Sequence, residues 1–505
     1  MRAYTKTILR DVGLLLHVPG VMALLSLPVG FVFNEHYAIW SFLWTAFFSL
    51  SIGQLLYHLF RNASEEAHLR HAMLTVALSW GLIPLLGAIP FMLIALHLSV
   101  FPLTPQTVLE FQNPWNAVFE SFSGFTSTGL SMALRSSELP RSLQWWRSFM
   151  EWIGGVGMIV LVLSVLEPST DAYQLYYAEG RSKKIALTVK ATVRNIWKIY
   201  LLYTVLSILL LCLVGMPWWE ALNHSMTGIS TGGFSVTDDS IGAYSPVVQL
   251  AVILIMIVGA ISFSAHYQLL AKRRLSALWR DAQHRALWLL LGLGTIVLLL
   301  ENYWFQGSFL WLDTLFQWVS ALGTCGFNTV KLQNWSPSAK LLLSVAMVFG
   351  AASGSTVGGL KLNRVVALYK GVLWHFRRIS LRPHQLMRYQ MNGKVLNEAQ
   401  AAQRVGSAAV LAVLWVGWLG LGVLVLLHVV QPQYTLNDVI FEAASALGSV
   451  GLSTGISHPD LHWVGKLILI LFMWMGRLEI IPVLVLFSSL IGYLRQGIHL
   501  QRRGK

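Results

Sequence analysis

The sequence predicts an all-α polytopic membrane protein. Four like-oriented helix–pore helix–helix repeats surround a central pore, and two further transmembrane helices precede them. Hydrophobic residues make up 55% of the 505-residue chain and charged residues only 11%. Many apolar runs approach or exceed the roughly 20 residues that a helix needs to cross a hydrocarbon core about 30 Å thick. Four short segments rich in glycine and hydroxyl side chains interrupt this apolar sequence in a common register.

The apolar runs predict ten membrane spans, at residues 12–33, 38–60, 72–98, 143–166, 196–215, 246–270, 286–302, 338–360, 405–430 and 463–492. The first span contains Pro19 and Pro28 and lacks a small-x-small cleavage pattern, which favours a retained helix over a signal peptide. Cys212 and Cys325 lie within or near the spans and predict neither a disulfide nor a metal framework.

Basic residues are distributed unevenly between the two sides of the predicted membrane. With a cytoplasmic N-terminus, most of them fall inside, in segments 183–198, 272–285 and 361–404 and in the C-terminal tail. The outer side holds only Arg135, Arg141, Arg147, Lys331, Lys340 and Lys466. By the positive-inside rule, this predicts a multi-pass protein of the cell (inner, or cytoplasmic) membrane with both termini in the cytoplasm. It also accounts for the net charge of +14 without a nucleic-acid partner.

The four interrupting segments are "GFTSTGLSM" (124–132), "GISTGGFSV" (228–236), "LGTCGFNTV" (322–330) and "LGSVGLSTG" (447–455). Thirteen residues before the shared glycine stands a polar residue suited to a helix N-terminus, and six before it stands a hydroxyl. The polar residues are Asn116, Glu220, Asp313 and Asp438; the hydroxyls belong to Ser123, Thr227, Ser320 and Ser445. External turns share this composition, but turns do not explain one register repeated four times.

The amphipathic run before each glycine is only about ten residues long, too short to cross a bilayer at 1.5 Å per residue. We therefore expect a helix that enters partway and returns as an extended loop, buried in protein or lining water. The predicted division is an N-terminal two-helix addition (1–66), repeats 1 to 3 (67–180, 181–280, 281–372), a basic cytoplasmic segment (373–402) and repeat 4 (403–505).

Extended loops that meet on an axis can bind a bare cation through backbone oxygens. Rings of carbonyls replace the hydration shell of K+, and glycine adopts backbone angles closed to other residues. No carboxylate lies within the four loops, which disfavours a filter for divalent cations. The predicted metal (K+) residues are Ser127, Thr128, Gly129, Thr231, Gly232, Gly233, Thr324, Cys325, Gly326, Ser449, Val450 and Gly451. No covalently bound cofactor is expected.

On these motifs the chain resembles the Trk/Ktr/HKT superfamily of potassium transporters over nearly all its length. "ESFSGFTSTGL", "HSMTGISTGGFS" and "FQWVSALGTCGFNT" resemble the first three filters of Trk-type (TrkH) membrane subunits, whereas "FEAASALGSVGLSTG" is closer to the Ktr type. The resemblance implies potassium uptake, passive or ion-coupled, by a homodimer. In this superfamily a glycine in all four filters accompanies potassium preference, and serine in the first accompanies sodium in some plant members.

The eighth predicted span contains a second polar interruption, "FGAASGSTVGGLK" (349–361). Its glycines weaken helix propensity, and we interpret it as a break that enters the pore; the resemblance implies an intramembrane gate. Small-residue helix packing is the alternative, which the intervening hydroxyls disfavour. The predicted gate residues are Gly350, Gly354, Ser355, Gly358, Gly359, Lys361 and Arg477.

Arg477 stands about fourteen residues into the tenth predicted span, too deep to reach either interface easily. An arginine within a membrane is costly and is by default a functional residue; the resemblance implies an electrostatic barrier that faces the pore. The alternative is a structural contact with Glu151 or with a carbonyl of another span. Glu479 lies on a different helix face from Arg477 and is not an obvious partner.

The segment 361–404 is basic, with Glu398 its only acidic residue. A solvated helical face near anionic lipid is the simplest interpretation, and the resemblance implies docking of a cytoplasmic nucleotide-binding regulatory subunit of the TrkA/KtrA type. The sequence lacks both a G-x-x-x-x-G-K-[ST] motif and a strand–G-x-G-x-x-G–helix context, so nucleotides would act through that partner.

Two other functions are open: a secondary transporter of another solute, and a sodium-permeable cation channel of the same fold. Secondary transporters often use inverted repeats, which the like-oriented units disfavour. A membrane enzyme is not expected, since the histidines form no H-E-x-x-H pattern. No residue indicates whether H+ or Na+ symport accompanies K+.

Overall fold

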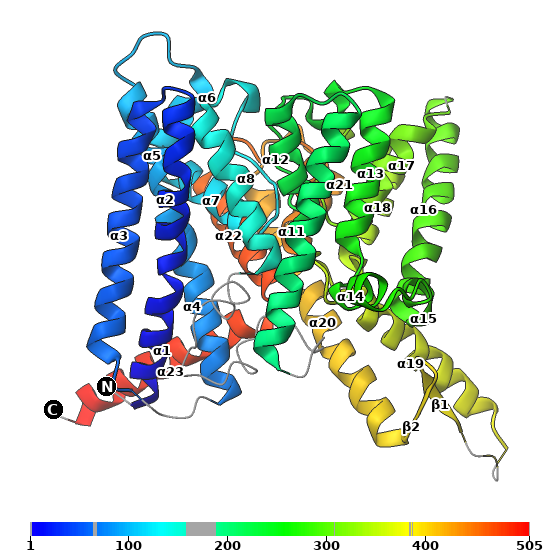
Figure 1. Cartoon of the computed structure of the whole chain (residues 1–505). Helices are drawn as coiled ribbons and strands as arrows, with labels where there is room; N and C mark the ends of the chain where they lie inside the picture. The colour runs from blue at the N-terminus through cyan, green and yellow to red at the C-terminus, as the bar shows by residue number, and fades with distance from the viewer. Residues whose placement is uncertain are drawn as a thin grey trace.

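The computed structural model describes residues 3–63, 68–157, 188–307, 309–382, 385 and 387–503. The predicted boundary between repeats 1 and 2, together with Lys183 and Lys184, lies outside these residues. Most described helices run between two opposite ends of the molecule, and both termini lie at the same end (Figure 1). The fold is mostly helical, and several of its helices are long and apolar enough to cross a membrane, as the composition predicts.

The N-terminal helices form one flank of the molecule (Figure 1). They are α1 (Ala3–Leu15), α2 (His17–Val32) and α3 (His36–Phe60), followed by α4 (Leu69–Gly87) and α5 (Ile89–Leu98). Helices α1 and α2 together make one apolar span, Tyr4–Val32. Both pack against α3, so the first two predicted spans form a hairpin.

Four short helices follow at intervals along the chain, each between longer ones: α7 (Pro114–Phe125), α12 (Trp218–Ile229), α17 (Trp311–Leu322) and α21 (Leu436–Gly448). Asn116, Glu220, Asp313 and Asp438 lie in their first turns, as the register predicts. In α21 the Thr435 and Asp438 side chains form a reciprocal capping box. At 12 or 13 residues each, these helices are too short to cross a membrane.

The longer helices after the loops close the four units into a circle. They are α8 (Arg141–Val156), α13 (Pro246–Ala260), α18 (Pro337–Phe349) and α22 (Trp463–Arg477). Each packs on the next short helix: α8 on α12, α13 on α17, α18 on α21, and α22 on α7. Buried polar contacts reinforce two of these joints, because Lys340 Nζ lies 2.7 Å from Asp438 and Lys466 Nζ lies 2.6 Å from Asn116.

The remaining long helices are α11 (Val189–Leu213), α16 (Ala282–Gln306), α19 (Leu362–Ser380) and α20 (Glu398–Val429). Helices α14 (Phe263–Lys272) and α23 (Ile481–Arg503) follow the bends after α13 and α22, and the short α15 (Ala277–Arg280) precedes α16. Short turns of helix link these elements: α6 (Gln106–Leu109), η1 (Glu110–Gln112), η2 (Ser136–Glu138), η3 (Ser240–Ala243) and η4 (Leu332–Asn334).

Two predicted spans bend sharply and are not continuous helices, and a third is interrupted where the sequence predicts a break. The span 246–270 bends by 99° between α13 and α14, where the Ser262 side chain caps the new helix. The span 463–492 bends by 117° between α22 and α23, at Glu479 and Ile480 with positive φ. The span 338–360 ends as a helix at Phe349, before Gly350 at φ 63°. By length and composition, six described helices can cross a membrane, or eight if each bent pair counts as one span.

A small β-hairpin joins α19 to α20 and is an exception to the predicted all-α class. Strands β1 (Tyr389–Met391) and β2 (Lys394–Leu396) pair in antiparallel register, with Met391 opposite Lys394. Asn392 and Gly393 form the two-residue turn, both at positive φ. Asn-Gly is the strongest short hairpin signal. The hairpin projects from the helical body near the end that holds the termini (Figure 1).

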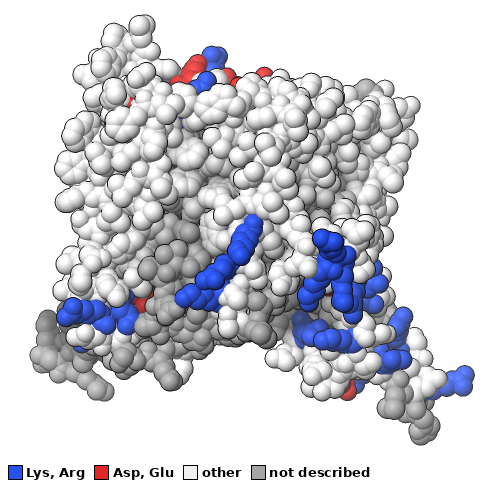
Figure 2. Space-filling view, in the orientation of Figure 1, with Lys and Arg blue, Asp and Glu red and all other residues white. Residues whose placement is uncertain are grey.

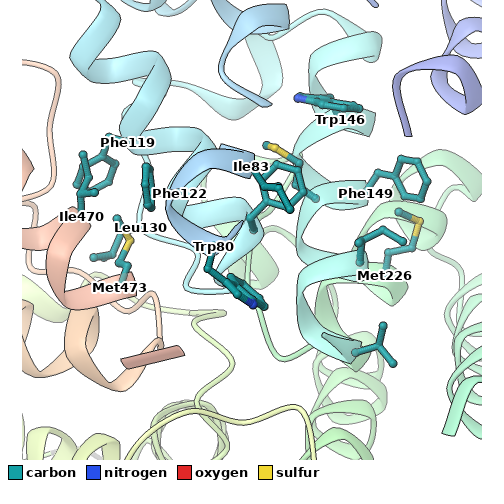
Figure 3. Packing of buried hydrophobic residues seen from close by; sticks show 14 of the residues in the cluster. Trp80, Ile83, Phe119, Phe122, Leu130, Trp146, Phe149, Met226, Ile470 and Met473 are labelled. Atoms are coloured by element: carbon teal, nitrogen blue, oxygen red, sulfur yellow. The ribbon is translucent and has the colours of Figure 1, made fainter. Parts of the chain in front are cut away.

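The apolar core lies between the short helices and the longer ones around them. Trp80 and Ile83 of α4, Phe122 of α7 and Trp146 of α8 gather in one cluster, which Met473 of α22 completes (Figure 3). Lysine and arginine side chains gather on the visible face toward the end that holds both termini, while a small mixed group of charges lies at the opposite end (Figure 2). The core fixes the short helices, and the charge pattern distinguishes the two ends.

Candidate functional site

The loops that follow the four short helices meet in a closed ring. A Cβ atom built on Gly129 would lie less than 3.0 Å from the carbonyl oxygen of Gly232 in the second loop, a separation that real Cβ atoms essentially never show. The same holds for Gly233 against Cys325, for Gly326 against Val450, and for Gly451 against Thr128. The contacts therefore run from loop 1 to 2 to 3 to 4 and back to loop 1. A side chain at any of the four glycines would push into the neighbouring loop.

Each loop is held by the same backbone hydrogen bond to its own short helix. The amide before the ring glycine donates to the carbonyl six residues before that glycine: Thr128 to Ser123, Gly232 to Thr227, Cys325 to Ser320 and Val450 to Ser445, at 2.8–2.9 Å. The residues two before the glycines are Ser127, Thr231, Thr324 and Ser449, and all have φ between 47° and 54°. Such strained backbone costs about 1–3 kcal/mol per residue and is found at functional sites.

A polar side chain on each short helix faces the outer part of its loop, nine residues before the ring glycine. Glu120 accepts from Ser131, His224 contacts Ser235 at 2.9 Å, and Glu442 accepts from Ser453 at 2.8 Å. The matching pair of the third unit is Gln317 and Asn328, and within the described residues the Gln317 amide has no hydrogen-bond partner. This spacing recurs in the sequence and could have been found there.

The Ser453 contact gives a test of how much such a clamp contributes. The Ser453 hydroxyl donates to Glu442 and accepts the Gly455 N–H. Ser453→Ala therefore removes one of the donors to the buried Glu442 carboxylate and takes this acceptor from the half-buried Gly455 N–H. We expect it to lower the free energy of unfolding by about 1–3 kcal/mol, measured by thermal unfolding in detergent. Ser99→Ala, at an exposed hydroxyl that donates to the Leu96 carbonyl one turn before it, is the control and should change little. Equal stability of both variants would contradict the clamp.

The interrupted segment 350–361 lies against the C-terminal ends of the short helices. The Gly358 amide donates to Thr324 of the third loop at 2.9 Å. The Thr356 hydroxyl lies 3.3 Å from the Ile229 carbonyl at the end of α12 and 3.2 Å from the Thr231 hydroxyl. A Cβ on Gly358 would collide with the Gly448 carbonyl at the end of α21. The segment is not helical, so the predicted break is present and small-residue helix packing does not describe it.

The predicted gate residues are divided between this segment and its anchors. Gly350, Gly354 and Gly359 have positive φ, which allows the tight turns of the segment. The Gly354 carbonyl accepts the Phe263 amide, which ties the segment to α14. The Ser355 hydroxyl donates to the Ala352 carbonyl at 2.6 Å, within the segment itself.

Arg477 is the last residue of α22, so its predicted place in the middle of a continuous span is wrong. Its guanidinium donates to the Thr356 carbonyl at 3.2 Å and to the Gly155 carbonyl at 2.9 Å, and it also contacts Gly154. The Trp80 ring lies 5.2 Å from its Cζ atom. Arg477 therefore bridges the interrupted segment and the end of α8. These are the carbonyl contacts of the structural alternative, and Glu479 is not its partner.

Glu479 instead pairs with the start of α19. Its carboxylate lies 2.7 Å from Lys361 Nζ and also forms an ion pair with Arg364. Lys361 and Glu479 both have positive φ, so two strained turns are held together by charge. This contact connects the interrupted segment to the break between α22 and α23. The sequence placed Lys361 near the gate but gave no indication of its acidic partner.

Comparison with known proteins gives consistent matches over nearly the whole chain. The TrkH family, described as a cation transport protein, matches residues 39–492. An uncharacterised cation transporter of Methanocaldococcus jannaschii is 33% identical over 96% of this chain and 95% of its own length. The Trk system potassium uptake protein TrkH of Halomonas elongata is 32% identical over 96% of this chain and 98% of its own.

A solved structure matches the fold at similar coverage. The crystal structure of the potassium transporter TrkH from Vibrio parahaemolyticus aligns with a TM-score of 0.80 and 26% sequence identity. The alignment covers 96% of this chain and 98% of that chain.

Proposed function

Because the chain belongs to the TrkH family of cation transport proteins, we propose that it takes up potassium across the cytoplasmic membrane through the ring of four loops. The observation that carries this proposal is the closed contact between each ring glycine and the next loop's carbonyl. It brings backbone oxygens from all four units together, which is the arrangement that suits a dehydrated monovalent cation. The relatives named for potassium uptake support the choice of ion.

The strained residues before each glycine belong to the same proposal. Ser127, Thr231, Thr324 and Ser449 together with the four glycines turn the backbone twice within each loop. We expect K+ to bind there through the carbonyls of the twelve filter residues. The short helices end beside the loops, and their partial negative charge adds to the attraction for a cation.

We infer that segment 350–361 is the gate and that Arg477 holds it closed. The segment contacts the second and third loops and the end of α21, and Arg477 ties it to α8. Movement of this segment would open a path on the side of the ring where the short helices end. The membrane potential would drive uptake, at about 2.3 kcal/mol per charge per 100 mV.

The location and partners follow from the charge pattern and the relatives. The gathering of lysine and arginine at the end that holds both termini supports cytoplasmic N- and C-termini. The relatives are named as members of a Trk system, and we propose a homodimer that docks a cytoplasmic nucleotide-binding regulatory subunit of the TrkA/KtrA type. The basic α19 helix and its hairpin are the proposed docking region. H+ or Na+ symport is not part of the proposal.

Flux through purified protein tests the proposed function. Liposomes carrying the protein should take up 86Rb+, as a substitute for K+, at least several times faster than 22Na+ under an inside-negative potential. Protein-free liposomes are the control. In potassium-starved cells that lack their own uptake systems, the chain should restore Rb+ accumulation. Equal Rb+ and Na+ uptake would favour the sodium-permeable alternative, and neither cation entering would favour transport of another solute.

A further inference from the structure

The second loop differs from the other three immediately before its ring glycine. That position holds Gly232 in loop 2, where the other loops have Thr128, Cys325 and Val450. Those three side chains are completely buried. Loop 2 has no side chain of its own there. The backbone gives no reason for glycine at this position, because Gly232 is not among the glycines with positive φ.

A side chain from α8 fills the vacant place. The carboxyl group of Glu151 lies where a side chain on residue 232 would begin, so that a Cβ atom there would collide with it. Both carboxyl oxygens accept the Phe234 amide, at 3.2 Å and 3.1 Å. Glu151 is completely buried. The Glu151 carboxyl group fits in this place because residue 232 has no side chain.

No other unit repeats this arrangement. Glu151 stands 22 residues after Gly129, and the same position in the other units holds Ile255, Val348 and Met473. Among the described residues Glu151 forms no ion pair. Arg147, one helical turn before it, pairs with Glu120 at 2.7 Å.

Glu151 also contacts loop 1 through its backbone. The Ser127 hydroxyl donates to the Glu151 carbonyl at 2.9 Å. One residue of α8 therefore contacts two neighbouring loops, loop 1 by its main chain and loop 2 by its side chain. Since each loop touches the next around the ring, a shift of loop 2 would displace loops 1 and 3 as well.

We propose that Glu151 is a positioning residue for ion selectivity: its carboxyl group replaces the missing side chain of loop 2 and fixes that loop through the Phe234 amide. Selectivity then depends on an oxygen that accepts the Phe234 N–H and on a side chain that fills the space beside Gly232. It does not depend on the charge of Glu151. The inference rests on the proposed function, because selectivity is read out at the ring.

Four variants separate these elements. Glu151→Gln keeps the size and an acceptor oxygen, so discrimination between Rb+ and Na+ in liposomes should stay at the parent's value. Glu151→Ala removes both, and discrimination should fall about tenfold, equivalent to ~1.4 kcal/mol. In Gly232→Val the new side chain would collide with Glu151, so discrimination between Rb+ and Na+ should fall as far as in Glu151→Ala. The double variant Glu151→Ala/Gly232→Val rebuilds in loop 2 the side chain that loop 4 has in Val450, and should recover most of the loss.

Several results would overturn the inference. The first is discrimination between Rb+ and Na+ in Glu151→Ala that equals the parent's. The second is a double variant that discriminates no better than the worse single variant. The third is a Glu151→Gln variant that discriminates as poorly as Glu151→Ala, which would assign the effect to charge. The control is Glu301→Ala, at a glutamate of α16 that accepts from the Ser336 hydroxyl at the start of α18, and it should match the parent.

Hydrogen exchange separates failure of this inference from failure of the proposed function. Amide exchange of the peptide that contains Phe234 should speed up in Glu151→Ala and stay slow in Glu151→Gln, whichever ion the protein transports. If the parent protein fails to discriminate Rb+ from Na+, the proposed function fails, and this exchange pattern still decides whether Glu151 positions loop 2. Unchanged exchange in Glu151→Ala would refute the positioning role by itself.

Discussion

Replacing Gly129 with serine is expected to reduce discrimination between K+ and Na+ by about tenfold or more, equivalent to at least ~1.4 kcal/mol. Gly129 has φ 89°, a backbone angle that residues with a side chain rarely adopt, and any Cβ there would collide with the Gly232 carbonyl. The serine therefore has to push loop 1 away from loop 2. A wider ring no longer fits the dehydrated K+ better than hydrated or smaller ions.

Rb+ and Na+ uptake into liposomes, measured on the same preparation, checks this result. Gly292→Ser is a matched control, because Gly292 lies on α16 with nothing within 4 Å of an added Cβ. The control should keep the parent's ratio of Rb+ to Na+ uptake. If Gly129→Ser also keeps it, Gly129 does not line the ion path and the filter proposal loses its first loop.

Replacing Arg477 with alanine is expected to raise cation flux about tenfold, as if ~1.4 kcal/mol were removed from the barrier. Arg477 is the described bridge between segment 350–361, at Thr356, and the end of α8, at Gly155. Its removal frees the segment on one side and deletes a positive charge beside the proposed path. Both effects act in the same direction. Single-channel currents or initial Rb+ uptake rates at equal protein amounts measure the change.

Arg477→Lys distinguishes the two contributions. Lysine keeps the charge, but a single ammonium cannot reach both carbonyls in the way that the planar guanidinium does. If charge alone blocks ions, the lysine variant should conduct like the parent; if bridging holds the gate, it should conduct nearly as well as Arg477→Ala. We expect the second result, because the guanidinium contacts carbonyls of two separate segments. Flux in Arg477→Ala at or below the parent's, with normal protein level, would rule out both.

The register of four glycines was enough to predict the short helices and the segments that meet in the ring. It succeeded because the same local solution recurs: a polar first turn, a buried hydroxyl residue and a glycine that touches its neighbour. Gly129, Gly233, Gly326 and Gly451 could therefore be identified together. The break after Phe349 was also predictable, since several glycines within one apolar run oppose a helix.

Other features depend on contacts between distant residues and have no local signal. The bends after α13 and α22 fall within runs that qualify as membrane spans by length and composition. In the folded chain they are marked by the Ser262 cap and by the positive φ of Glu479 and Ile480. The ion pair of Glu479 with Lys361 joins residues 118 apart. Glu151 could be suspected from sequence only as a carboxylate within a span; its relation to Gly232 needed the fold.

A single polypeptide that supplies all four quadrants can differ in each of them. In an assembly of four identical subunits, any substitution would be repeated in all four. A segment that blocks the path from one subunit would likewise be present four times. Here the third unit contributes segment 350–361 and the fourth contributes Arg477. The second loop is held by a side chain from α8, which belongs to the first unit. If segment 350–361 is the gate, as proposed above, the path closes from one quadrant alone, and release of that one segment is enough to open it.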